Sequence, residues 1–184
     1  MIGAAENQQA EFSRTAKLGE LGSRPHAATL KAGPNELTAL AARFDCLVLD
    51  ALTADLEAVR TGETVRVTGR FGASGAQRCV ATGDPVPFAL DEPVDLTFLP
   101  LPRPGDPDEE VELGEDELDT LFHDGRIVDW GEAVAQSLGL ALDPYPRSPQ
   151  AAEVLAEAGV KSEDEVEPIG ALSGLKALLE GRQI

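Results

Sequence analysis

The sequence predicts an α+β fold in which two or three short helices pack on a twisted antiparallel sheet. Residues 64–73 alternate without interruption between small or apolar side chains and polar ones, as in a strand with one buried face and one solvated face. Glycine and proline separate the apolar runs that follow, which is typical of a meander; these runs lie at 75–82, 86–90 and 94–98. Apolar residues at helical spacing occur at 36–44 and 130–142.

The strands that precede this stretch are expected to form the other half of the sheet. We predict a weak edge strand within 11–18, a short strand at 28–32 and a long strand at 47–59. The long strand turns at 61–63 into residues 64–73 as a hairpin, and its inward side chains are Leu52, Ala54, Leu56 and Ala58. A second turn is expected at 72–75. Five to seven strands result, and their pattern alone does not decide whether the sheet closes partly into a barrel.

Capping residues define the predicted helices. Asn35 is the expected N-cap of the first helix, whose first turn carries Glu36. Asp129 and Glu132 have capping-box spacing, with Asp in place of Ser or Thr, at the start of the second helix. The second helix should bury Trp130, Val134, Leu138 and Leu142, and Pro144 should end it. Another short helix is expected at 151–158.

Acidic residues are concentrated in the second half of this 184-residue chain of net charge −18. Residues 1–103 carry ten Lys/Arg and thirteen Asp/Glu, whereas 104–184 carry five and twenty. This asymmetry indicates either a face for a basic partner or a means of staying in solution, and it opposes nucleic-acid binding by the whole surface. We expect one α+β domain over 11–148, with a flexible N-terminus at 1–10, a mobile acidic loop at 101–118 and an acidic tail with short helices at 149–184.

Several classes of protein are disfavoured by the composition. Two cysteines argue against a disulfide framework, and Cys79 is expected to be a small buried side chain. The N-terminus lacks the pattern of a secretory signal, and no apolar run approaches the ~18 residues of a membrane span, so we expect a cytoplasmic protein with no membrane partner.

No pattern of catalytic or metal-binding residues is present in the sequence. His26, Cys46, Cys79 and His123 are too widely spaced to resemble a zinc site, and no glycine-rich phosphate loop precedes a helix. We therefore predict no catalytic residues, no metal, no cofactor and no enzymatic activity.

Arginines on one predicted strand are candidates for binding phosphate. Arg66 and Arg70 lie on the polar face of residues 64–73 with Thr68 between them, and Arg78 of the next expected strand could join them, depending on register. Forked guanidinium donors suit phosphate oxygens. The alternative is a solvated face on which arginine is used for its long stem.

Several segments, taken together in order and spacing over residues 11–148, resemble the YceD family of bacterial proteins and their plastid relatives. These segments are Phe12-Ser-Arg14, Leu37-Thr-Ala-Leu-Ala-Ala-Arg-Phe44, Leu47-Val-Leu-Asp-Ala-Leu52, Val67-Thr-Gly-Arg70, Ala76-Gln-Arg-Cys79, Asp91-Glu-Pro-Val-Asp-Leu-Thr-Phe-Leu-Pro100, Val128-Asp-Trp-Gly-Glu-Ala-Val134 and Leu140-Ala-Leu-Asp-Pro-Tyr-Pro-Arg147. The last of these segments resembles the form found in the alphaproteobacterial branch of the family. Many relatives have Cys-x-Arg-Cys where this chain has Ala76 first, so a metal or redox role is not carried over.

The resemblance implies a non-catalytic factor in 23S rRNA accumulation and large ribosomal subunit biogenesis. From the charge asymmetry we expect a basic ribosomal protein or assembly factor as the partner. The candidate residues for contact with 23S rRNA or this partner are Arg66, Thr68, Arg70, Arg78, Tyr145 and Arg147. An acidic partner-binding arm would comprise Asp108, Glu109, Glu110, Glu112, Glu115, Asp116 and Glu117. The alternative is an acidic protein-binding module, or a holdase for a basic client, that has no contact with RNA.

Overall fold

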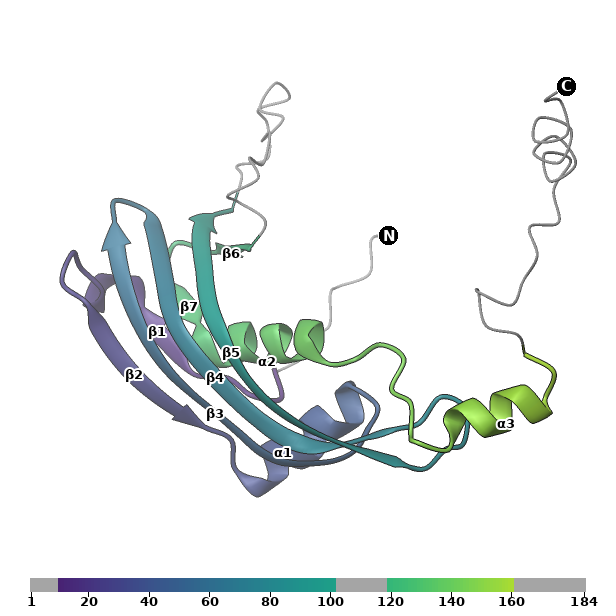
Figure 1. Ribbon diagram of the computed structural model, residues 1–184. Coiled ribbons are helices and arrows are strands. Elements are labelled where there is room, and N and C mark those ends of the chain that lie inside the picture. The colour runs from purple at the N-terminus through teal and green to yellow at the C-terminus, as the bar shows by residue number, and fades with distance from the viewer. Residues whose placement is uncertain (1–9, 102–118, 161–184) are drawn as a thin grey trace, which may run out of the picture.

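The computed structural model describes residues 10–101 and 119–160, and in this part of the chain it confirms the α+β class. A strongly curved five-stranded sheet has the order β2-β3-β4-β5-β6, and a small second sheet pairs β1 with β7 (Figure 1). The strands are β1 (Thr15–Lys17), β2 (His26–Lys31), β3 (Cys46–Thr61), β4 (Thr64–Arg78), β5 (Pro85–Pro100), β6 (Thr120–His123) and β7 (Ile127–Asp129). The helices are α1 (Pro34–Arg43), α2 (Trp130–Ala141) and α3 (Ala151–Glu157), with a 3-10 turn η1 (Leu18–Glu20).

Strands β2 to β5 form an antiparallel meander, because each pairs antiparallel with the next, and this confirms the predicted type of sheet. Strand β6, which the sequence pattern did not indicate, pairs parallel with the end of β5. The weak edge strand expected within 11–18 is β1, and it pairs with β7 rather than with the main sheet. Within the described residues the large sheet does not close into a barrel.

The predicted turn at 72–75 was wrong, and so was the separation of 86–90 from 94–98. Strand β4 runs straight through this glycine-rich stretch, and β5 pairs with it from Pro85 to Phe98. The reason is close packing between strands: a Cβ at Gly75 would lie 3.1 Å from the Cα of Leu49 and would overlap the carbonyl oxygen of Val48. Gly75 therefore lets β3 and β4 approach closely instead of turning the chain.

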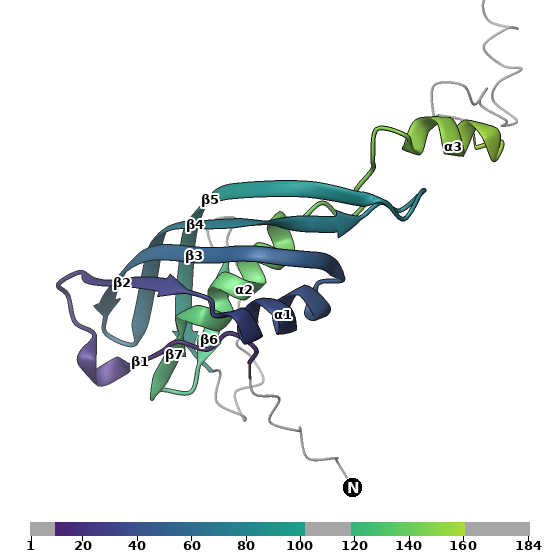
Figure 2. The same ribbon diagram turned by 90° about the horizontal axis from the view of Figure 1, so that it is seen from below.

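The inner face of the curved sheet carries the core. The alternation predicted for β3 and β4 is confirmed, because the inward side chains are all buried; they are Leu52, Ala54, Leu56, Ala58, Val65, Val67, Phe71 and Ala73. Helix α2 lies inside the curve and α1 lies beside it on the same side of the sheet (Figure 2). The residues predicted to face inward from α2 are also buried. Gly131 lets α2 begin directly against residues 12–14, since a Cβ there would lie 2.6 Å from the carbonyl oxygen of Phe12.

The caps of the two long helices differ from expectation in detail. Asn35 is not an N-cap: Gly33 is, because Pro34 takes the first helical position, where its missing N–H costs nothing. The Gly33 amide donates to Glu36 Oε2 at 2.7 Å. Asp129 does cap α2 by accepting from the Glu132 amide at 3.1 Å. The Glu132 carboxylate does not complete the box and pairs with Arg43 of α1 instead.

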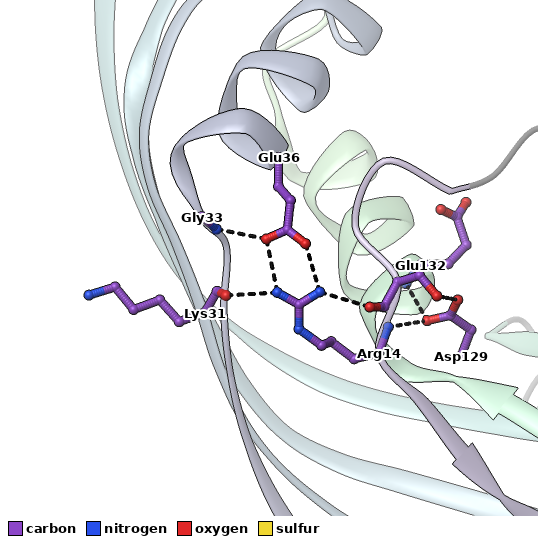
Figure 3. Close-up of polar contacts among 7 residues, drawn as sticks. Arg14, Lys31, Gly33, Glu36, Asp129 and Glu132 are labelled. Carbon is purple, nitrogen blue, oxygen red and sulfur yellow. Dashed lines mark hydrogen bonds and ion pairs between the residues drawn. The ribbon is translucent and has the colours of Figure 1, made fainter.

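Arg14 joins three elements at the open side of the sheet (Figure 3). Its guanidinium contacts both carboxylate oxygens of Glu36, at 2.7 and 2.9 Å, and donates to the carbonyl oxygen of Lys31 at 3.1 Å. Its amide donates to Asp129 at 2.8 Å. The Arg14 hydrogen bonds, followed by that of the Gly33 amide, lower the pKa of Glu36. The start of the domain is thus tied to α1, to the end of β2 and to the start of α2.

Helix α3, predicted at 151–158, lies beyond the far end of the sheet (Figure 1). The expected acidic loop at 101–118 lies almost entirely outside the described residues, as do the expected N-terminus and the end of the acidic tail. All seven residues of the acidic arm fall in that part.

Replacement of Gly69 by alanine should destabilise the fold strongly. Gly69 has φ +154°, and a Cβ would lie 2.9 Å from the Cα of Leu56 and would overlap the carbonyl oxygen of Asp55. We expect Gly69→Ala to cost on the order of 3 kcal/mol in the free energy of unfolding, measured by urea denaturation.

Gly72→Ala on the same strand is the matched control, because its Cβ would meet only ordinary contacts at 3.6 and 3.7 Å. Its stability should stay within about 1 kcal/mol of wild type. Equal losses of stability from both substitutions would contradict the conclusion that Gly69 is required by the close approach of β3 and β4.

Candidate functional site

Two of the predicted phosphate-binding arginines are already occupied by carboxylates. Arg66 donates to both oxygens of Asp95, at 2.9 and 2.7 Å. Arg70 donates to Asp91 Oδ1 at 3.0 Å and to the Asp91 carbonyl oxygen at 2.8 Å. In the β4–β5 register each aspartate lies diagonally across from its arginine. These hydrogen bonds lower the pKa of both aspartates, so all four groups are charged at neutral pH.

The outer face around these pairs carries further acid. Asp55 lies directly opposite Arg70, and Glu57 lies opposite Thr68, which is half-buried between the strands. Exposed ion pairs are weak, roughly 0.2–1 kcal/mol each, so the pairing itself would not prevent a phosphate from approaching. Phosphate would instead be repelled by the carboxylates, because each guanidinium on this face is already matched by one. The predicted surface of Arg66, Thr68 and Arg70 is therefore a solvated sheet face on which carboxylates outnumber guanidiniums.

Arg78 does not join Arg66 and Arg70. It belongs to β4 rather than to the next strand, and it lies eight residues beyond Arg70. At ~3.3 Å per residue the separation is about 26 Å. Arg78 therefore stands at the far end of the sheet, close to the point where α2 ends.

A loop after α2 packs on this end of β4, so that Tyr145 and Arg147 lie at the same end of the sheet as Arg78. Gln77 Nε2 donates to the Asp143 carbonyl oxygen at 2.9 Å, and the Val80 amide donates to the Pro146 carbonyl oxygen at 2.9 Å. Three predicted site residues from two distant parts of the chain thus lie at the same end of the sheet. We call the exposed residues at this end, which are Arg78, Val80, Leu140, Tyr145 and Arg147, the end surface.

The end surface is exposed and mixed in chemistry. Leu140 is 83% exposed, Tyr145 70% and Val80 54%. Within the described part of the chain, neither Arg78 nor Arg147 has a carboxylate partner, in contrast to Arg66 and Arg70. A cavity of about 260 Å³ opens beside Arg78 and is lined in part by Pro144 and Pro146. Asp45 and Asp143 line the same cavity and moderate its positive charge.

Cys79 fastens the loop beneath this surface. Its buried sulfur accepts from the Ser148 amide at 3.2 Å and from the Thr82 amide at 3.4 Å. Burial alone would raise the pKa of the thiol, but the hydrogen bonds from Ser148 and Thr82 outweigh it and bring the pKa down to about 6. The prediction that Cys79 is buried is confirmed, although it lies outside the main core cluster.

The other candidate ligands have structural roles. His123 is buried: its Nδ1 accepts from the Gly125 amide, so its Nε2 donates to the Glu63 carbonyl oxygen at 2.7 Å. His26 lies edge-on to Trp130, with ring centroids 5.8 Å apart. Among residues 10–101 and 119–160, no three His, Cys, Asp or Glu side chains gather in a way that could hold a metal ion.

Sequence reasoning missed Val80, Leu140 and Ser148. Leu140 falls outside the i, i+4 stripe of α2, which is the signal that could have marked it as exposed. The contact of Ser148 with Cys79 joins positions 69 residues apart, and no local pattern reports such a contact.

Comparison with family models, with curated proteins and with solved structures finds no match to this chain. In the described ranges, every helix is too short or too polar to cross a bilayer.

The hydrogen-bonded thiol predicts a pH-dependent contribution to stability. A pKa that falls from 9.0 to about 6 on folding stabilises the fold fully above pH 9 and loses this effect as the pH falls toward 6. The difference in Tm between wild type and Cys79→Ser should therefore be larger at pH 9 than at pH 6.

Cys46→Ser is the control for this measurement, because burial raises the pKa of Cys46. Its Tm difference from wild type should not grow with pH. A Cys79→Ser difference that is constant between pH 6 and pH 9 would show that the sulfur is a neutral thiol.

Proposed function

We propose that this protein is a non-catalytic factor in 23S rRNA accumulation and large ribosomal subunit assembly, that it contacts rRNA through the end surface, and that it binds a basic ribosomal protein or assembly factor. The biological role rests on the resemblance to the YceD family. The assignment of the RNA contact rests on one observation, which is that Arg78, Tyr145 and Arg147 lie at the same end of the sheet and that neither guanidinium has a carboxylate partner in the described residues.

The end surface suits a short single-stranded RNA segment. An exposed tyrosine can stack on an unpaired base, and two guanidiniums can reach the flanking phosphates. The contact must be small and local, because phosphate neutralisation drives most RNA affinity and the rest of the surface repels phosphate. Residues 10–101 and 119–160 carry nineteen Asp/Glu against eleven Lys/Arg.

The same excess of acid supports a basic protein as the second partner. Complementary charge speeds association with such a partner and disfavours acidic competitors. A protein that binds rRNA weakly at one end and a basic protein elsewhere would hold the two together during assembly. The second candidate function, a module or holdase for a basic client, needs only the acidic surface and predicts no role for Tyr145.

Substitutions in the end surface should weaken RNA binding in two distinguishable ways. With single-stranded 23S rRNA fragments, Tyr145→Ala should lower the affinity roughly tenfold through lost stacking. Arg78→Ala with Arg147→Ala should reduce the dependence of log K on log salt by about 1.4, or 0.7 for each phosphate contact. Fluorescence anisotropy over a salt series measures both effects.

Arg66→Ala with Arg70→Ala is the matched control, because it removes the same number of guanidiniums from the face on which they are paired with aspartates. It should leave affinity and salt dependence unchanged. Equal losses from the two double variants would mean that RNA binding is non-specific, and no loss from either would favour the module that has no RNA contact.

The cellular role is tested by rRNA profiling and ribosome sedimentation in a deletion strain. We expect reduced 23S rRNA and a precursor of the large subunit, restored by wild type and less well by Tyr145→Ala. Normal 23S rRNA and a normal subunit profile would remove the assembly role.

A further inference from the structure

Two strand edges face each other without pairing on the open side of the sheet. Among the strands of the described residues, β1 pairs only with β7 and β2 only with β3; Figure 1 shows the two strands side by side. Both views place β1 between β7 and β2 (Figure 2). The Arg14 guanidinium reaches across to the Lys31 carbonyl oxygen and bounds one end of the gap (Figure 3). We call this gap the β1–β2 slot.

The free edge of β2 offers a regular row of backbone groups. The Ala32 amide donates to the Leu52 carbonyl oxygen, so even-numbered residues of β2 bond to β3. Odd-numbered residues then point their N–H and C=O groups away from β3, and the bond from Arg14 to the Lys31 carbonyl agrees with this. Ala27 and Thr29 therefore present donors and acceptors to the slot.

The edge of β1 completes the opposite wall. The Arg14 carbonyl oxygen accepts from the Trp130 amide, and the Leu18 amide donates to the Arg126 carbonyl oxygen, so even-numbered residues of β1 bond toward β7. Thr15 and Lys17 then direct their backbone groups away from β7. A main chain is the ligand that can match alternating donors and acceptors along such edges.

The slot contains space and a buried polar group. A cavity of about 340 Å³ lies between residues 13–16 of the first edge and His26, Ala28 and Leu30 of the second. Trp130 lines this cavity and is 3% exposed. Its Nε1 is the one buried side-chain donor in the described part of the chain that lacks a hydrogen-bond acceptor.

The other long free edge is protected against strand pairing, whereas β2 is not. Strand β5 pairs with β6 over its last four residues, and within 10–101 and 119–160 no strand pairs with 85–96 on that side. The Thr97 amide donates to the Asp119 carbonyl oxygen, so the backbone N–H and C=O groups of odd-numbered β5 residues point away from β4. Prolines stand at three of those outward positions, and proline there removes the donor that a new strand would need. β2 contains no proline.

We propose that an extended segment of a basic partner protein adds as a strand to β2 in the β1–β2 slot. That the partner is basic rests on the proposed function above, whereas the slot stands on the backbone geometry alone. Side chains of the added strand alternate, so every second one faces inward toward Trp130 and suits a small apolar residue.

The outward side chains of the added strand lie near acidic residues of β3. They lie next to Ala27 and Thr29, whose short side chains stand opposite Glu57 and Asp55 on β3. A hollow of about 350 Å³ at this place is lined by these four residues and by Gly69, which adds no side chain of its own. Within the described residues Glu57 has no partner. A lysine or arginine stem can cross the hollow and pair with Glu57, at about two strand spacings or 10 Å.

The probe for this proposal is acetyl-Lys-Val-Lys-Val-Lys-Val-amide, titrated into the full chain. Trp130 is the only tryptophan, so its fluorescence reports the slot directly. We expect a saturable change, slower amide hydrogen exchange at Ala27 and Thr29, and no binding of the Glu-Val counterpart. No change up to millimolar peptide would overturn the proposal.

Ala27→Pro removes one outward backbone donor without breaking a hydrogen bond to β3, and should weaken peptide binding at least tenfold. Ala89→Pro does the same to the protected β5 edge and should have no effect. Glu57→Gln should weaken peptide binding several-fold. This variant keeps the test decisive if Ala27→Pro fails to fold. Equal effects of the two prolines, or peptide binding that is insensitive to both Ala27→Pro and Glu57→Gln, would refute strand addition.

The outcome is separable from that of the proposed function. Ala27→Pro should leave rRNA binding intact, and Arg78→Ala should leave peptide binding intact. Peptide binding without any rRNA effect would keep the slot and remove the RNA contact.

Discussion

The close approach of β3 and β4 is the constraint on which the rest of the structure depends. Gly69 and Gly75 lie against the backbone of β3 at distances that no side chain would permit. Long strands that approach in this way can bend, and the bend lets one sheet wrap around α2. The bend also separates the two ends of the sheet, so that β1 and β7 form a separate small sheet beside α2 instead of completing a barrel.

Charge in this molecule acts locally. The chain is strongly acidic, yet the predicted site arginines differ from one another: Arg66 and Arg70 lie diagonally opposite aspartates in the sheet, whereas Arg78 and Arg147 have no carboxylate partner among the described residues. Antiparallel register makes this distinction, since the spacing of β4 against β5 decides which carboxylate meets which guanidinium. Net charge therefore says which partners the whole surface favours, but it does not say where an anion can bind.

The two proposed contacts use different parts of the same architecture. The end surface depends on a loop held to the end of β4 by a side-chain hydrogen bond from Gln77, a main-chain hydrogen bond from Val80 and the sulfur of Cys79. The β1–β2 slot depends on Arg14, which holds the first strand to α1 and α2 while leaving the strand edges apart. Because the two regions lie at opposite ends of a curved sheet, they can be occupied together.

By itself, the sequence determined the α+β class, the meander, the long hairpin and the buried faces of β3, β4 and α2, because each follows from side-chain period over a few neighbouring residues. It also indicated Tyr145, Arg147 and Arg78 as candidates. Tertiary structure alone decided that Gly72 and Gly75 extend a strand, that Gly33 rather than Asn35 caps α1, and that β6 and β7 exist at all. It also decided that Arg66 and Arg70 are neutralised and that Arg78 joins the loop after α2. These outcomes depend on contacts between residues far apart in the chain, whose register and approach no local pattern encodes.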